Sequence, residues 1–232
     1  MNRIDLLTIA LAASGLALAG FFVPAAYADT ILLSSNPTFQ YSAQTVNMTS
    51  PKTESFQDGG AMNFTDQTTG ANLLMYCVDV MDSINIGQPT AGYTPTPLSS
   101  YTPFTSTVQT NIEKLFTQDL PLVDSSDAAV GFQEALWTII YANTGNPYVG
   151  NADSAANAYA STWSNPSNLS GAATNGYYLT VWSNGIAGQA GTNQILISFT
   201  PDAPAPEPST WALVASGFAG VFLIGRRRRA RS

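Results

Sequence analysis

Two apolar segments, one near each end of the chain, leave one long polar stretch that can form a folded domain. The first runs from Leu6 to Val23 and the second from Trp211 to Gly225. Segments of this kind are directed to a membrane rather than to a water-soluble core. Residues 29–200 lie between them and are numerous enough to bury a sizeable core. The sequence therefore predicts a single folded domain with a membrane-directed segment on either side.

Residues 1–28 have the organisation of a secretory signal peptide. Arg3 supplies the positive start, an apolar core follows, and Ala26-Tyr27-Ala28 fits the small-residue cleavage pattern. Cleavage by signal peptidase at this point would make Asp29 the first residue of the mature protein. The alternative is an N-terminal anchor that is not cleaved.

The C-terminal segment has three parts with different physical roles. Pro206, Glu207 and Pro208 hold the backbone extended, and residues 201–208 form a proline-rich linker. Residues 211–225 can enter lipid as a helix, with Trp211 at the headgroup level. The arginines that follow cannot cross a bilayer cheaply and would stay in the cytoplasm. They are Arg226, Arg227, Arg228, Arg229 and Arg231.

This apolar run is short for a permanent membrane anchor. Residues 211–225 span roughly 22 Å as a helix at 1.5 Å per residue, whereas the hydrocarbon core of a bilayer is ~30 Å thick. The run of Pro206-Glu207-Pro208-Ser209-Thr210-Trp211-Ala212-Leu213 and the arginines make residues 206–232 resemble the PEP-CTERM sorting signal. The resemblance implies processing by an exosortase in a Gram-negative bacterium that makes exopolysaccharide. The alternative is an ordinary single-span anchor.

The charge of the domain excludes one large class of partners. Within residues 29–200 the only basic side chains are Lys52 and Lys114, against twelve acidic ones, so the formal charge is 2 − 12 = −10. Such a domain repels phosphate backbones, and we expect no nucleic-acid binding.

The residue types that are missing exclude several chemistries. The chain has no histidine and only one cysteine, Cys77. It therefore lacks Ser-His-Asp and Cys-His catalysis, nearly all histidine-based metal sites, and an intramolecular disulfide. We expect neither a cofactor nor a metal. A single cysteine in an exported protein is either buried as a small hydrophobic residue or used chemically.

Hydrophobic periodicity predicts an α+β domain with an antiparallel β-sheet core, a central helix and one or two further short helices. Strands are expected at 38–49, 61–66, 72–80, 177–183 and 194–199, with a hairpin turn at 67–70. Residues 84–107 should form a long ordered loop or a broken strand. Helices are expected at 108–120, from 124 or 125 to 141, and at 151–163.

Gln133 occupies an unusual position in the central helix. Residues three and four positions away are apolar, including Ala129, Leu136 and Trp137, so Gln133 lies within an apolar stripe. The opposite face should be polar; it carries Asp127, Gly131, Glu134, Thr138 and Tyr141. Burying an unpaired amide costs roughly 1–3 kcal/mol. Something in the core must therefore pair with the Gln133 side chain or react with it.

Cys77 is the residue that could react with Gln133. A thiolate can attack a glutamine carbonyl and expel ammonia, leaving a thioester between the two side chains. The reaction needs contact and exclusion of water, but neither histidine nor metal. Strand 72–80 is apolar on both faces, so we expect Cys77 to be buried there.

The sequences around these two residues resemble thioester domains of bacterial surface adhesins. Tyr76-Cys77-Val78-Asp79 is similar to the aromatic-Cys-x-acid segment, and Gln133-Glu134-Ala135-Leu136-Trp137 to the Gln-x-Ala-Ile-Trp segment. The resemblance implies a Cys77–Gln133 bond, with Asp79 and Trp137 in supporting positions. Phe132 departs from the threonine that is usual before the glutamine.

The sequence thus predicts an exported protein rather than an enzyme, tethered to the inner membrane as a precursor and then placed at the cell surface or in the extracellular matrix. It would attach to extracellular polysaccharide or to surface amines or hydroxyls, with the thioester as the covalent link. The alternative is a non-covalent component of an exopolysaccharide matrix with an inert Cys77. In a minor alternative, carboxylates such as Asp79, Asp82 or Glu134 would hydrolyse a glycan.

Overall fold

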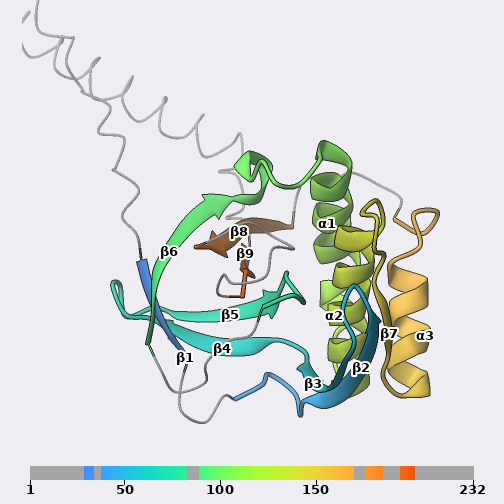
Figure 1. The fold of residues 1–232 in the computed structure, drawn as a ribbon. Helices are drawn as coiled ribbons and strands as arrows, with labels where there is room; N and C mark the ends of the chain where they lie inside the picture. Colours follow the sequence, from blue (N-terminus) through green and yellow to red (C-terminus); the bar gives the residue numbers. More distant parts are fainter. Residues whose placement is uncertain (1–28, 34–37, 83–88, 170–175, 185–193, 202–232) are drawn as a thin grey trace, which may run out of the picture.

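The computed structural model describes residues 29–33, 38–82, 89–169, 176–184 and 194–201. Six of the described strands close into an antiparallel barrel (Figure 1). In their order around the barrel they are β1 (Asp29–Leu33), β4 (Met62–Asp66), β5 (Asn72–Cys77), β9 (Leu196–Pro201), β8 (Tyr177–Ser183) and β6 (Pro89–Pro97).

A second, smaller sheet lies beside the barrel. It consists of β3 (Glu54–Gly59), β2 (Gln44–Ser50) and β7 (Val149–Asn151), in that order. The chain passes from β3 to the barrel strand β4 at Gly60, whose φ of +117° favours glycine. Gly60 therefore marks the point where the backbone leaves one sheet and enters the other.

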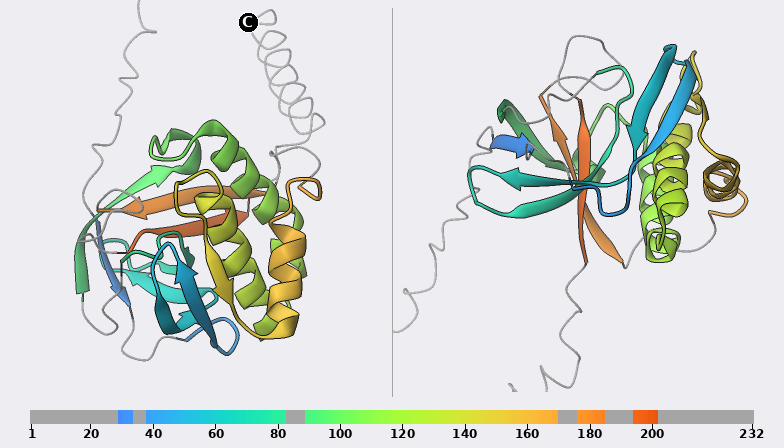
Figure 2. Two further views of the ribbon diagram at one scale, coloured as in Figure 1. Left: turned by 45° about the vertical axis from the view of Figure 1, so that its right-hand side comes forward. Right: turned by 90° about the horizontal axis from the view of Figure 1, so that it is seen from below.

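Three α-helices pack on one side of the barrel (Figures 1 and 2). They are α1 (Ser106–Gln118), α2 (Ser126–Tyr141) and α3 (Ser154–Trp163). The short 3₁₀ helix η1 (Leu98–Ser100) precedes α1, and η2 (Leu120–Leu122) connects α1 to α2. Thr105, Ser125 and Asp153 cap the three helices by accepting hydrogen bonds from backbone N–H groups of the first turn. Helix α2 lies between the other two (Figure 1), and most of its residues are buried.

The α+β class and the antiparallel core with a central helix are confirmed. The hairpin at 67–70 is also present: Gly70 donates to the carbonyl of Asp66, whose carboxylate accepts from the Thr68 and Thr69 N–H groups. The strand expected at 72–80 ends earlier, at Cys77. Within the region expected to be a loop or broken strand, β6 pairs with both β1 and β8.

The predicted signal peptide, the part of the predicted linker after residue 201 and the sorting signal lie outside the described residues. Within the described ranges, no helix is both long enough and apolar enough to cross a membrane. The predicted helix at 211–225 is not part of these ranges and stays a prediction.

An aromatic cluster joins the barrel to the helices. Tyr76 of β5 packs on Phe132 of α2, with ring centroids 4.8 Å apart, and Phe132 meets Phe116 of α1 edge-on at 5.0 Å. Phe199 of β9 extends the cluster through Phe116 and Tyr76. The buried rings of Tyr76, Phe116 and Phe132 fix α2 against β5, the contact on which the candidate site depends.

Candidate functional site: the Cys77–Gln133 contact

The structure brings Cys77 and Gln133 together in the buried core. The backbone N–H of Cys77 donates a hydrogen bond to Gln133 Oε1 at 3.0 Å. Gln133 Nε2 donates in turn to the backbone carbonyl of Cys77 at 2.7 Å. Only 4% of Cys77 and 1% of Gln133 are exposed. The glutamine carboxamide thus forms a two-bond pair with the backbone of the cysteine.

The barrel topology explains why this backbone needs a partner. Val78 donates its N–H to Ile195 in the segment leading into β9, so the N–H and carbonyl of Cys77 face the opposite side, towards β4. The β4–β5 pairing reaches Met62 and Met75 and would next place residue 60 opposite residue 77. Because the chain turns away at Gly60, the Gln133 amide takes the place of a strand partner.

Helix α2 is buried on more sides than its sequence pattern predicts. Gly131, Glu134 and Tyr141, which were expected on a polar face, are all buried. A Cβ at Gly131 would lie 2.5 Å from the Cβ of Tyr159 and 2.8 Å from the carbonyl oxygen of Ala156. The prediction of a polar face is therefore wrong, because α3 packs against Gly131 at a distance that only glycine allows, and Tyr141 is buried against Asp79.

The environment of Cys77 disfavours its thiolate form. Burial and, to a smaller extent, the negative charge of Asp79 raise the pKa of the Cys77 thiol to about 12. The thiol is therefore neutral at physiological pH. Asp79 does not activate Cys77 electrostatically; any supporting role it has must be structural.

Asp79 holds the chain just after β5. Its Oδ1 accepts hydrogen bonds from the Tyr141 hydroxyl at 2.9 Å and from the Met81 N–H at 2.7 Å. The Tyr141 hydroxyl also accepts from the N–H of Val80 at 3.4 Å. These bonds tie the segment after Cys77 to the end of α2, two turns beyond Gln133. The sequence pattern puts Tyr141 on the polar face of the helix, although a residue eight positions after Gln133 lies near the same side.

The other predicted supporting residue, Trp137, is 3% exposed and contacts Tyr148, with ring centroids 5.4 Å apart. Its indole N–H has no hydrogen-bond partner among the described residues. Trp137 thus anchors α2 against the segment that leads into β7. Phe132, the departure from the adhesin pattern, is explained by its place in the aromatic cluster.

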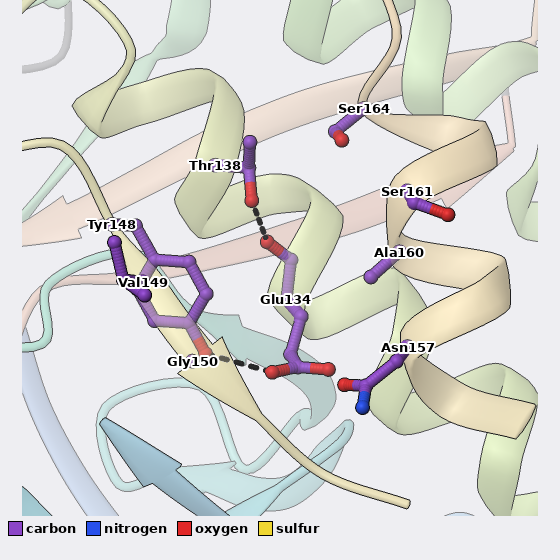
Figure 3. A pocket seen from close by; sticks show the side chains of 9 residues that line it. All are labelled: Glu134, Thr138, Tyr148, Val149, Gly150, Asn157, Ala160, Ser161 and Ser164. Carbon is purple, nitrogen blue, oxygen red and sulfur yellow. Dashed lines mark hydrogen bonds between the residues drawn. The ribbon is translucent and has the colours of Figure 1, made fainter. Parts of the chain in front are cut away.

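Glu134, next to Gln133 in sequence, lines a separate pocket. The pocket lies between α2, α3 and β7 (Figure 3). Among the described residues that line it, Glu134 is the only carboxylate; Asp79 and Asp82 do not line it. The three carboxylates of the hydrolase alternative are therefore not gathered in this pocket. No group of three or more potential metal ligands occurs in the described part of the chain.

Comparison with known proteins gave a match in the C-terminal part of the sequence. The sequence model of one family, the PEP-CTERM protein-sorting motif, matches residues 204–229. Residues 204–229 thus carry a PEP-CTERM sorting motif. The motif supports export, processing at the membrane and sorting by an exosortase. No curated protein and no solved structure gave a significant match.

Proposed function

We propose that this PEP-CTERM protein attaches covalently, once per molecule, to a partner at the cell surface or in the extracellular matrix through a thioester between Cys77 and Gln133. Sorting rests on the tail motif. The observation that carries the covalent step is the buried two-bond contact between the Gln133 carboxamide and the Cys77 backbone. It is a proposal of a single-use reaction, and not of an enzyme.

The reaction balances without any further reagent. Cys77 Sγ bonds to Cδ of Gln133, the bond from Cδ to Nε2 breaks, and the thiol proton leaves with that nitrogen as ammonia. The Cys77 N–H already points at Gln133 Oε1. It would stabilise the negative charge that develops on this oxygen during the attack, as an oxyanion-hole donor does.

Burial has two opposite effects on this reaction. The raised pKa of Cys77 leaves very little thiolate, which slows formation. The nearness of the Gln133 carboxamide to residue 77 would compensate, because effective molarities of well-oriented intramolecular reactions reach about 10⁵–10⁸ M. The same burial keeps water from a completed thioester. The site is thus suited to slow formation during folding and to long storage of the bond.

The target would be an amine or hydroxyl on a polysaccharide or a neighbouring surface. The domain offers few amines of its own, Lys52 and Lys114. Lys52 is already engaged: its Nζ donates to the Met81 carbonyl at 3.2 Å and lies 3.5 Å from a carboxylate oxygen of Glu54. Self-quenching of the thioester by lysine is correspondingly limited.

A second candidate function is that of a non-covalent matrix component with an inert Cys77. The observation in its favour is that the hydrogen bonds at both ends of the Gln133 amide are satisfied by the Cys77 backbone. In that case Gln133 serves only to complete the barrel edge. The two candidates differ in the chemical state of a single sulfur atom.

Thiol titration of freshly unfolded protein separates these two candidates. Because Cys77 is the only cysteine, the thioester predicts no reactive thiol on unfolding until an amine or hydroxylamine is added, and then one thiol per chain. Gln133→Leu, which cannot form the bond, should show one thiol at once, and Cys77→Ala provides the blank. One full equivalent in the unfolded wild-type protein, without added amine, would exclude the thioester.

A further inference from the structure

The pocket beside Glu134 contains a polar atom that lacks a partner. The Glu134 side chain is 2% exposed, and its Oε1 accepts a hydrogen bond from the Tyr148 hydroxyl at 3.0 Å. Its Oε2 is buried and has no hydrogen-bond partner within the described part of the chain. Leaving a buried acceptor unsatisfied costs about 1–3 kcal/mol, and more for a charged group. A donor from outside the chain would remove this cost.

The chain is shaped closely around this carboxylate. A Cβ at Gly150 would overlap the Tyr148 hydroxyl and would come within 2.8 Å of Glu134 Oε1. Only glycine at this position of β7 therefore allows the Glu134–Tyr148 bond. Figure 3 shows the carboxylate directed into the pocket, with its first oxygen joined to Tyr148. Desolvation raises the pKa of Glu134, which agrees with a carboxyl group held away from water.

The remaining lining consists of neutral polar and small apolar groups. The polar members are the hydroxyls of Thr138, Tyr148, Ser161 and Ser164 and the amide of Asn157. Asn157 Oδ1 already accepts from the Ala152 N–H at 3.0 Å, but a carbonyl oxygen has a second lone pair. The cavity volume is about 320 Å³, at the lower end of the range of small-ligand sites.

We propose that this pocket binds a neutral saccharide unit, with a sugar hydroxyl donating to Glu134 Oε2. Sugar hydroxyls both donate and accept hydrogen bonds, as the hydroxyl and amide groups of the lining do. A site for a cation would be expected to gather more than one carboxylate, whereas this lining holds one. The inference does not depend on the thioester, because the side chains of Glu134 and Gln133 leave α2 towards different partners, Tyr148 and Cys77.

The test is a binding titration of the full chain, purified in detergent and carrying Cys77→Ala, so that no covalent reaction at Gln133 contributes. The probes are glucose, galactose, mannose and N-acetylglucosamine, with methylammonium chloride as the cationic probe, followed by ligand-observed NMR. At least one neutral sugar should bind saturably. Glu134→Gln should weaken that binding about tenfold or more, because a hydrogen bond to a charged group is lost.

A pair of tryptophan substitutions on α3 locates the binding without altering the core. Ser161→Trp would fill the pocket from an exposed position, whereas Thr162→Trp, its exposed neighbour, lies outside the lining. Sugar binding should disappear in the first variant and persist in the second. The proposal is overturned if none of these sugars binds, if Ser161→Trp leaves binding intact, or if methylammonium binds and the sugars do not.

Discussion

Replacing Gln133 by leucine tests whether its carboxamide completes the barrel edge. The substitution keeps the side-chain volume but leaves the N–H and the carbonyl of residue 77 without partners in a buried site. Each unsatisfied buried group costs about 1–3 kcal/mol, so the two together should lower the free energy of unfolding by about 2–6 kcal/mol. The effect is measured in a Cys77→Ala background, where no thioester contributes and the backbone of residue 77 is unchanged.

The assay is reversible urea unfolding followed by tryptophan fluorescence, with Gln109→Leu in the same background as the matched control. Gln109 Nε2 donates to the carbonyls of Tyr101 and Phe104, but its side chain is only partly buried. Water can replace its bonds, and we expect a loss of about 0.5–1.5 kcal/mol. The reasoning is refuted if Gln133→Leu costs no more than Gln109→Leu.

Three further substitutions test other parts of the structure. Gly131→Ala should destabilise the fold by about 1–3 kcal/mol through overpacking against α3. Its control, Gly145→Ala, should be nearly neutral, because a Cβ at residue 145 meets nothing within 4 Å. Equal urea midpoints for the two variants would contradict the close packing of α2 on α3. Tyr141→Phe should cost about 1–3 kcal/mol, because Asp79 and the Val80 N–H lose their bonds to the hydroxyl, and an unchanged midpoint would show that these bonds add no stability. Desolvation raises the pKa of Asp119 from 3.8 to about 6 in the folded state, so the folded protein holds this proton more tightly than the unfolded chain. The wild type should therefore lose stability relative to Asp119→Asn as the pH rises from about 4 to about 6, and the difference should then stay level. Parallel pH profiles of the two urea midpoints would refute the shift.

The sequence was informative where local patterns and tertiary structure agree. Helix α2 is capped by Ser125, one of the two predicted caps, and ends at Tyr141, because capping and hydrophobic periodicity both mark its limits. Strand β8 spans residues 177–183 as expected. The placement of Gln133 opposite Cys77 also followed from two local patterns, an apolar strand and a polar residue within an apolar stripe.

The features that the sequence did not predict depend on how distant segments pack together. The polar-looking face of α2 is buried because α3 covers it, and no feature within α2 itself indicates this covering helix. Glu134 and Tyr148 form a bond that depends on Gly150, in a strand that was not predicted. The closure of the barrel required β6, a strand containing several prolines that local propensity places in a loop.

The intact mass of the purified, exported chain tests the central claim most directly. The thioester predicts a mass lower than that of the unmodified chain by one ammonia, and a gain of one methylamine at Gln133 after incubation with that amine. Cys77→Ala should show neither change. A folded protein that has the full calculated mass, unaltered by methylamine, would contradict covalent attachment and leave the Cys77–Gln133 contact a structural element of the barrel.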